Sequence, residues 1–426
     1  MNSPDPSCVI VGGSAAGIAA AIELRQQGFS GAVTVVDSDP HVPYERPPLS
    51  KTLLASDNDG LVPIQSSDTY RELDITLLLG ERAVKIDTTL RRVELRGGDV
   101  LQADRLILAT GLSARHLPTP GATAPNVLTL RDAFDAQRLS QQLSGGGPLV
   151  IVGAGFIGLE LAAVARTRGI DVTVVEATQY PLARSVGSRV AELLIDLHRG
   201  NGVKLLLGTT ISHMNGTERA VEQVCLSDGR TLPAATVVVG VGGEAQVEFA
   251  ATAGIDVDSN GISVNSYGQT NVPWIFAAGD VAVQPHPDLL VPGRVEHWDA
   301  ALRHGAAIGS SIAGHTTSFT DPIYAWSDQY GTTLQTVGRG RATDEFILRR
   351  GARADQFLAF WVRDGHVGAA AGLGTPREIA IVKRLISSKV PVTGTDLVDQ
   401  NHDLRSLLKA HKSTTGTKIE TAALGH

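Results

Sequence analysis

The stretches VIVGGSAAG (residues 9–17) and LVIVGAGFIG (residues 149–158) decide the fold class of this chain. Each is an apolar run, then a glycine-rich turn, then a helix-like pattern. The first glycine of such a turn adopts dihedral angles that other residues avoid, the small middle residue lets backbone N–H groups approach a pyrophosphate, and the last glycine lets helix and strand pack closely. One copy can arise by chance, but two copies in one chain predict two bound dinucleotides.

The key positions of the two turns are Gly12, Ser14 and Gly17 in the first and Gly153, Gly155 and Gly158 in the second. Ser14 departs from the strict glycine pattern but is still small. Two dinucleotides side by side indicate an enzyme that passes electrons from one to the other.

An acidic residue follows each turn at a suitable distance. Asp37 lies 20 residues after Gly17, and Glu176 lies 18 residues after Gly158. A carboxylate at the end of this strand accepts hydrogen bonds from a ribose and repels a 2′-phosphate. No Arg or Lys follows Glu176 before Arg184, which favours NADH over NADPH. The alternative is that both residues are ordinary acids at exposed strand ends.

Composition narrows the function further. The chain has 426 residues, of which 42% are hydrophobic, so we expect two or three globular domains. A net charge of -7 argues against nucleic acid as a main partner. No apolar run is long enough for a membrane span, and the first residues show no targeting signal, which predicts a cytoplasmic protein.

The cysteine content excludes a class of flavoproteins. The sequence holds two cysteines, Cys8 and Cys225, and both lie in apolar runs without a neighbouring partner. Reduction of disulfides through a local cysteine pair is therefore excluded. The same count leaves no ligands for an iron–sulfur cluster, and we expect no metal site.

The order of the motifs resembles that of the two-dinucleotide flavoprotein reductases over nearly the whole chain. Between and after the two turns come ATG (residues 109–111) and AAGD (residues 277–280). Two further stretches, YERPPLSK (residues 44–51) and WSDQY (residues 326–330), are similar to signatures of NADH-dependent ferredoxin reductases. Those enzymes serve bacterial oxygenases of the Rieske and haem-thiolate types. Rubredoxin reductases and apoptosis-inducing-factor-like flavoproteins are more distant relatives.

The resemblance implies an α/β fold with two Rossmann-like dinucleotide-binding domains and a C-terminal α+β domain with an antiparallel sheet. We expect a discontinuous FAD domain (1–114 and 246–322), an inserted NADH domain (115–245), a C-terminal domain (323–410) and a flexible tail (411–426).

The resemblance also implies which residues meet the cofactors. On the FAD side these are Gly12, Ser14, Ala15, Ala16 and Gly17 around the pyrophosphate, Asp37, Ser38 or Asp39 at the ribose, Ala83 at the adenine, Arg46, Lys51, Thr110 and Gly111 near FAD, Asp280 at the ribityl chain and Trp298 near the flavin. On the NADH side they are Gly153, Gly155, Phe156, Ile157, Gly158, Glu160, Glu176 and Gly242.

The chain departs from the family pattern at two more places. Leu128 stands where the family often has an Arg that reaches FAD, and the nearby Arg131 is a poor substitute on register. Ala245 and Gln246 stand where the family often has Pro-Asn, at the crossover between domains.

Hydride transfer depends on the alignment of the nicotinamide with the flavin and on the exclusion of water more than on acid–base catalysis. We therefore expect only three residues to take part in the chemistry. Lys51 would stabilise negative charge on the flavin and pair with Glu160; the alternative is two unrelated surface charges. Trp326 would stand at the electron exit; the alternative is a core tryptophan of the C-terminal sheet.

The expected reaction is electron transfer from NADH through FAD to an acidic ferredoxin of the two-iron two-sulfur type, by a monomer or weak dimer. A basic patch would bind the ferredoxin, and its candidate residues are Arg294, Arg303, Arg339 and Arg341. The alternative is that these four arginines are scattered over the surface. Alternative functions are an NADH-sensing flavoprotein, a rubredoxin reductase and an NADH oxidase or peroxidase, the last of which lacks its redox cysteine here. The sequence leaves the particular ferredoxin, the oxygenase and its substrate open.

Overall fold

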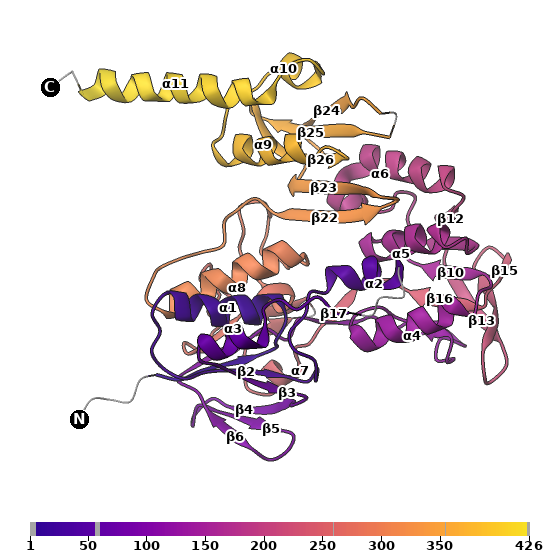
Figure 1. Cartoon of the computed structure of the whole chain (residues 1–426), viewed down its shortest axis with the longest axis horizontal. Coiled ribbons are helices and arrows are strands. Elements are labelled where there is room, and N and C mark those ends of the chain that lie inside the picture. The colour runs from indigo at the N-terminus through magenta and orange to yellow at the C-terminus, as the bar shows by residue number, and fades with distance from the viewer. Residues whose placement is uncertain (1–5, 56–59, 259, 354, 424–426) are drawn as a thin grey trace. The chain divides into compact units, whose positions relative to one another are not determined.

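The computed structural model describes residues 6–55, 60–258, 260–353 and 355–423 (Figure 1). The chain divides into two compact units. The first comprises Met1–His116, Thr129–Gln141 and Val241–Thr320, and the second comprises Leu117–Leu128, Gln142–Gly240 and Asp321–His426. The expected domain boundaries stay a prediction.

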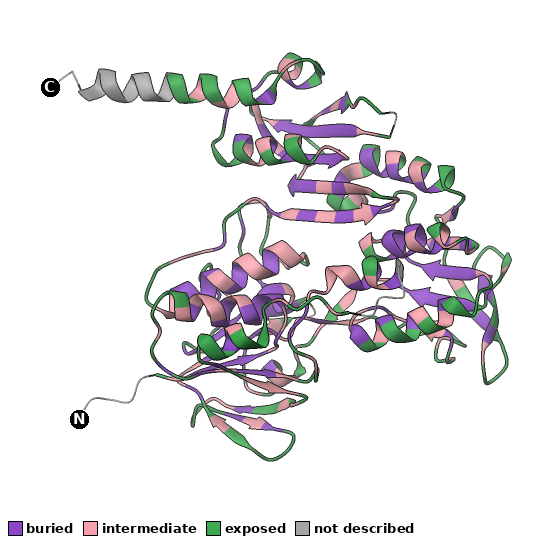
Figure 2. Ribbon diagram, viewed as in Figure 1, coloured by how far each residue is buried: buried purple, intermediate pink, exposed green. Residues whose placement is uncertain are grey.

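The first unit is built on a parallel sheet of strand order β20-β7-β1-β2-β3. Its strands are β1 (Cys8–Val11), β2 (Val33–Asp37), β3 (Ile75–Leu79), β7 (Arg105–Leu108) and β20 (Ile275–Ala277). The apolar runs of β1, β2, β7 and β20 are largely buried on both faces, as expected of parallel strands covered on both sides, whereas the edge strand β3 is only partly buried. Figure 2 shows this burial along the sheet.

Two long helices pack against each other in this unit, α1 (Ala15–Gln26) and α8 (Trp298–Ile312). Gly305 of α8 faces the backbone of Ala16, and Gly309 faces that of Ala20. A Cβ atom at Gly305 would collide with the carbonyl oxygen of Ala16. The two glycines therefore set the close approach of the helices.

The remaining elements of the first unit are short. They are the helical segments η1 (Pro47–Ser50), α2 (Thr52–Ala55), α3 (Ser67–Glu72), α7 (Glu248–Ala251) and η2 (Gly279–Val281), the sheet β4 (Ala83–Asp87), β5 (Arg92–Leu95) and β6 (Val100–Gln102), the pair β8 (Leu112–Ala114) and β17 (Gly243–Ala245), and the sheet β18 (Val257–Asp258), β19 (Gly261–Ser263) and β21 (Ala282–Val283). Helix α4 (Ala133–Ser144) begins in the first unit and ends in the second.

The second unit repeats the parallel design with strand order β12-β11-β10-β16-β9. The strands are β9 (Val127–Leu128), β10 (Leu149–Val152), β11 (Val172–Glu176), β12 (Lys204–Leu207) and β16 (Thr236–Val239), and the helices are α5 (Phe156–Thr167) and α6 (Ala183–Gly200). A three-stranded antiparallel sheet follows: β13 (Ile211–Gly216), β14 (Val221–Leu226) and β15 (Thr231–Pro233).

The second unit also contains the C-terminal antiparallel sheet, of order β22-β23-β26-β25-β24. Its elements are β22 (Tyr324–Gln329), β23 (Thr332–Gly338), β24 (Glu345–Arg350), β25 (Phe357–Arg363), β26 (His366–Leu373), α9 (Pro376–Ser387), α10 (Gly394–Val398) and α11 (Leu404–Ala423). The predicted fold class, with two parallel-sheet halves and this antiparallel sheet, is confirmed.

Helix α6 explains why the C-terminal sheet belongs to the second unit. Val186, Val190 and Leu194 of α6 share a core with Leu334 and Phe357 of the sheet. The opposite face of the sheet is covered by α9, through residues such as Ile379 and Val382. The sheet is thus buried on both faces.

Two expectations about segments remain. In the ranges that the structure describes, no helix is both long and apolar enough to cross a membrane. The flexible tail expected over 411–426 stays a prediction: α11 extends to Ala423, and residues 424–426 lie outside the described part.

Candidate functional site

The first glycine-rich turn joins β1 to α1 at the carboxyl end of the parallel sheet. Gly12 has a φ of 113°, and a Cβ atom there would collide with the carbonyl of Ala109 at the end of β7. A Cβ atom at Gly17 would likewise collide with the carbonyl of Gly12. Ser14 is the N-cap of α1 but makes no side-chain capping bond. The first N–H groups of α1 therefore receive no cap from the Ser14 side chain, and uncapped N–H groups at a helix start suit an anion such as a pyrophosphate.

Of the three candidate ribose ligands, Asp37 is the one at this turn. Its carboxylate accepts a short hydrogen bond from the N–H of Gly13 and another, of 2.9 Å, from the N–H of Asp39. Asp39 is engaged elsewhere, because its carboxylate accepts from the Tyr44 hydroxyl at 2.8 Å and lies 2.6 Å from Nδ1 of His41. Burial alone would raise the pKa of Asp39, but these hydrogen bonds outweigh it and lower this pKa below its ordinary value. Ser38 is exposed.

Strand β4 begins with Ala83, the predicted adenine contact, which stays a prediction. The N–H of Glu81 donates to the carbonyl of Asp37 at 2.9 Å, and Ala83 begins β4 two residues later. The chain after β3 is thus fixed to the end of β2.

The turn η2 brings Asp280 to the same edge of the sheet. Gly279 packs against Ala16 at the start of α1, so the second motif of the unit adjoins the first. Trp298, the first residue of α8, packs on the core cluster that contains Ala15 and Ala16. The structure thus gathers four of the predicted FAD-side residues in one place.

Arg131 completes this group, although register alone disfavours it. Its guanidinium lies 3.5 Å from the Asp280 carboxylate, and its Nε donates to the carbonyl of Leu112 at 3.0 Å. Arg46 and Glu296 are close enough to act on Asp280 electrostatically. Burial raises the pKa of Asp280, while Arg131 acts to lower it. Leu128, by contrast, is a buried strand residue of the second unit.

The crossover at Ala245 and Gln246 is tied to the predicted residues Thr110 and Gly111. The Thr110 hydroxyl donates to the carbonyl of Gln246 at 3.1 Å, and the N–H of Gln246 donates to the carbonyl of Gly111 at 3.2 Å. Gly242, with a φ of 100°, precedes this contact in the first unit. Lys51 follows η1 and is half-buried.

The second glycine-rich turn repeats the first. Gly153 has a φ of 100°, and its N–H donates to the carbonyl of Val175 at 2.8 Å. One oxygen of the Glu176 carboxylate accepts from the N–H of Ala154 at 2.8 Å, and the other accepts from the N–H and hydroxyl of Thr178 at 2.8 and 2.9 Å. Ile157, in the first turn of α5, exposes 41% of its surface. An apolar side chain exposed beside this turn suits a ligand contact.

Comparison with known proteins agrees with this geometry. Residues 6–305 match the family model described as pyridine nucleotide-disulphide oxidoreductase, and residues 324–408 match the reductase C-terminal domain. The chain belongs to the pyridine nucleotide-disulphide oxidoreductase family.

Relatives in this family narrow the comparison. The chain is 36% identical to rhodocoxin reductase of Rhodococcus erythropolis, over 98% of both chains. It is also 36% identical to the ferredoxin--NAD(+) reductase component of the p-cumate 2,3-dioxygenase system of Pseudomonas putida, over 95% of this chain and 99% of that one. The crystal structure of the ferredoxin reductase for the CYP199A2 system of Rhodopseudomonas palustris superimposes with a TM-score of 0.90 and 32% identity, over 94% of this chain and 99% of that one. The predicted resemblance and the cofactors FAD and NAD(H) are confirmed.

The predicted residues Glu160 and Trp326 of this pyridine nucleotide oxidoreductase lie on α5 and β22. Glu160 is 4% exposed, and its carboxylate accepts a hydrogen bond of 2.7 Å from the Ser327 hydroxyl. Trp326 is half-buried and stacks on Tyr324, with ring centroids 6.0 Å apart. Successive residues of a strand point to opposite faces, so β22 presents Ser327 to one side and Trp326 to the other.

The four arginines of the expected docking patch fall in both units. Arg294 and Arg303 belong to the first unit, where they pair with Glu296 and Asp299. Arg339 and Arg341 belong to the second. Two of the four therefore have part of their charge balanced by a neighbouring acid.

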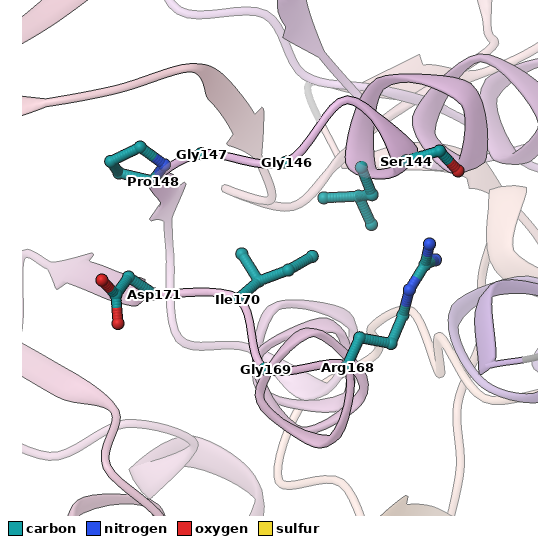
Figure 3. Close-up of a pocket in the computed structure, with 9 residues that line it drawn as sticks. Ser144, Gly146, Gly147, Pro148, Arg168, Gly169, Ile170 and Asp171 are labelled. Atoms are coloured by element: carbon teal, nitrogen blue, oxygen red, sulfur yellow. The ribbon is translucent and has the colours of Figure 1, made fainter.

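A surface pocket of about 460 Å³ lies at the amino ends of strands β10 and β11, opposite the carboxyl ends where the glycine-rich turn lies (Figure 3). Two loops, 144–148 and 168–171, face each other across it, before the starts of β10 and β11. Dinucleotides bind outside the carboxyl ends of such strands, so this pocket is separate from the nucleotide site. In the described part of the chain, no group of three or more His, Cys, Asp or Glu side chains gathers as a metal ion would require.

Proposed function

We propose that this flavoprotein takes hydride from NADH and passes single electrons to a ferredoxin that serves an oxygenase. One observation carries the proposal: two complete nucleotide turns occur in a chain whose two cysteines, Cys8 and Cys225, are free and buried. Burial raises the pKa of the Cys8 thiol to about 12, so this thiol does not ionise at neutral pH. The cysteines of this chain are therefore unsuited to receive the electrons that NADH delivers, which favours a partner protein as the acceptor.

FAD, when bound, accepts two electrons together and releases them one at a time. The residues of this chain hold the cofactors and exclude water. Asp37 and Asp280, with Arg131, would fix the FAD ribose and ribityl chain, and Glu176 would fix the NADH ribose. We further propose that Lys51 and Glu160 pair beside the flavin, and that Trp326 lies at the electron exit.

The partner we propose is an acidic two-iron two-sulfur ferredoxin, since Arg339, which is exposed, and Arg341, which is half-buried, contribute positive charge to the second unit. The names of the relatives, one a ferredoxin--NAD(+) reductase component of a dioxygenase system, support a ferredoxin. A monomer or weak dimer and a cytoplasmic location stay predictions.

An assay of cytochrome c reduction by NADH, with and without an added two-iron two-sulfur ferredoxin, tests the proposal. We expect rapid bleaching of the bound flavin by NADH and a cytochrome c rate that depends on the ferredoxin. A long-lived complex with NADH and no ferredoxin-dependent rate would identify an NADH sensor instead. Equal activity with rubredoxin alone would favour the rubredoxin reductase alternative.

Replacement of Trp326 by Ala tests the exit. We expect reduction by NADH in a stopped-flow instrument to persist while ferredoxin-dependent turnover falls. If Trp326 is only a core residue, its loss costs about 3–5 kcal/mol of stability, and both half-reactions fail together. Melting temperature measured beside both rates separates these outcomes.

A further inference from the structure

Five polar side chains form a continuous hydrogen-bonded line inside the second unit. The Tyr330 hydroxyl lies 2.9 Å from Nδ1 of His198, and Nε2 of His198 lies 2.9 Å from Oε1 of Gln329. Nε2 of Gln329 donates to the Ser327 hydroxyl at 3.1 Å, and that hydroxyl donates to Glu160 at 2.7 Å. The line therefore runs from Tyr330 to the predicted catalytic carboxylate.

Three separate elements contribute to this line. Glu160 comes from α5, His198 from the last turn of α6, and Ser327 and Gln329 from alternate positions of β22. The last three of these residues have at most 1% of their surface exposed. Polar groups buried this deeply are nearly always hydrogen-bonded, and each of them has a partner within the line.

The donor and acceptor atoms fix the direction of every bond. The Ser327 hydroxyl donates to Oε1 of Glu160, and its oxygen accepts from Nε2–H of Gln329. Oε1 of Gln329 in turn accepts from Nε2–H of His198, which leaves Nδ1 to accept from Tyr330. Burial lowers the pKa of His198 to about 4, so the ring is neutral at pH 7 and can take this tautomer. All four donors thus point toward Glu160.

We propose that His198, Gln329 and Ser327 are positioning residues that hold the Glu160 carboxylate in one orientation for hydride transfer and fasten α5 to the strand that carries Trp326. This inference rests on the proposed function. Hydrogen bonds donated to a carboxylate stabilise its ionised form, and a chain of aligned bonds strengthens each member. A fixed carboxylate at this point of α5 restricts where the nicotinamide can lie, which matters because small misplacements are costly to reaction rates.

Replacement of Ser327 by Ala removes the donor to Glu160 with little loss of volume. We expect the limiting rate of flavin reduction by NADH to fall about tenfold through misplacement, while the dissociation constant for NADH changes less than about threefold because the ribose contacts at Glu176 persist. Ser327→Thr, which keeps the hydroxyl, should restore most of the rate. Tyr330→Phe, at the far end of the line, should lower the rate less than Ser327→Ala does.

Thr333→Val supplies the matched control. It removes a hydroxyl that donates to Asp328 at 2.6 Å between β22 and β23 but does not belong to the line. The control should keep the wild-type rate at a similar melting temperature. Equal rates in Ser327→Ala and wild type, or equal losses in Ser327→Ala and Thr333→Val, would overturn the proposal. If Ser327→Ala does not fold, the rates of flavin reduction in Tyr330→Phe and in Thr333→Val are compared instead. Equal rates in these two variants would overturn the proposal.

A measurement that does not depend on turnover is the tautomer of His198. In protein with ¹⁵N-labelled histidine, we expect a neutral ring protonated at Nε2 from pH 6 to 8, assigned by its absence in His198→Phe. A ring protonated at Nδ1 would reverse the direction of the line, and a charged ring would donate from both nitrogens. Either result would refute the proposal. Failure of the wild type to be reduced by NADH would instead refute the proposed function and leave the tautomer result standing.

Discussion

The two nucleotide-binding turns share a backbone but differ in one pair of side chains. In both, the first glycine donates to the strand that ends in the acid, at 2.8 Å, and has a positive φ. In the first turn Gly13 donates to Asp37, and in the second Ala154 donates to Glu176. A Cβ atom at Gly13 would lie 2.9 Å from the Asp37 carboxylate. The shorter acid therefore requires glycine, whereas the longer glutamate leaves room for the methyl group of alanine.

The two halves also differ in what covers the binding helix. Helix α1 packs along α8, where Gly305 lets the two backbones touch. Helix α5 instead contacts β22 of the C-terminal sheet, through the bond between Glu160 and Ser327. The first helix thus packs through small residues, and the second is held by a hydrogen bond to a buried acidic side chain. We therefore expect the same motif to serve two roles, with FAD held permanently at the first turn and NADH entering and leaving at the second.

The largest expected effect is a difference in stability between alanine variants at Gly12 and at Gly155. Gly12→Ala should destabilise the first unit by about 1–3 kcal/mol of backbone strain and about 1–3 kcal/mol of overpacking against Ala109. A Cβ atom at Gly155 would meet no atom within 4 Å, and Gly155 has no positive φ. The stability of the protein should therefore be almost unchanged in Gly155→Ala. Flavin content and thermal unfolding of both variants measure the difference. Normal flavin content in Gly12→Ala would break the argument from the turn.

Acid should weaken both units through one buried histidine in each. Burial lowers the pKa of His304 to about 3 and that of His198 to about 4, below the value of about 6.5 in the unfolded chain. The unfolded state therefore binds more protons between these values, and stability that is complete above pH 6.5 is lost as the pH falls. At pH 5 the loss should reach about 2 kcal/mol for each histidine.

Calorimetry from pH 8 to pH 5 measures this loss. His304 accepts from the N–H of Gly279 at 3.2 Å in the first unit, and His198 belongs to the polar line of the second. His304→Asn should flatten the pH dependence of the first unit only, and His198→Asn that of the second only. Unchanged slopes in both variants would show that other groups carry the acid response.

Cofactor choice should depend on the second acid alone. Glu176 should repel the 2′-phosphate of NADPH and leave its oxygen unmatched, at a cost of about 2–3 kcal/mol, or roughly a hundredfold in kcat/KM. Glu176→Gln should narrow this gap, while Asp37→Asn should affect flavin binding and leave the preference for NADH. Equal kcat/KM for NADH and NADPH in the wild type would contradict the role of Glu176.

The parts of the candidate site whose residues are close together in the chain could be predicted from the sequence. The turns, Asp37 and Glu176 were predictable because a strand, a glycine turn and the next strand end recur at fixed spacing. The ion pair of Arg131 and Asp280 was not, because its members are 149 residues apart and, although the motif marked Asp280, register disfavoured Arg131. The contact of His198 with Gln329 spans 131 residues for the same reason. The Lys51–Glu160 pair stays a prediction, since no local pattern tests it.

The smallest expected effect tests the pairing of the acid with its turn residue. Gly13→Ala should cost about 1–3 kcal/mol, because its methyl group would crowd the Asp37 carboxylate. Asp37→Glu alone should also destabilise the first unit, since the longer side chain overshoots Gly13. The double variant reproduces the Ala154–Glu176 pair of the second turn, so the two losses should partly cancel, with a coupling of about 0.5–3 kcal/mol. Thermal unfolding of all four proteins closes this cycle. Strict additivity would mean that the two turns tolerate their acids for unrelated reasons, whereas a favourable coupling would show that the length of the acid and the size of the turn residue are set together.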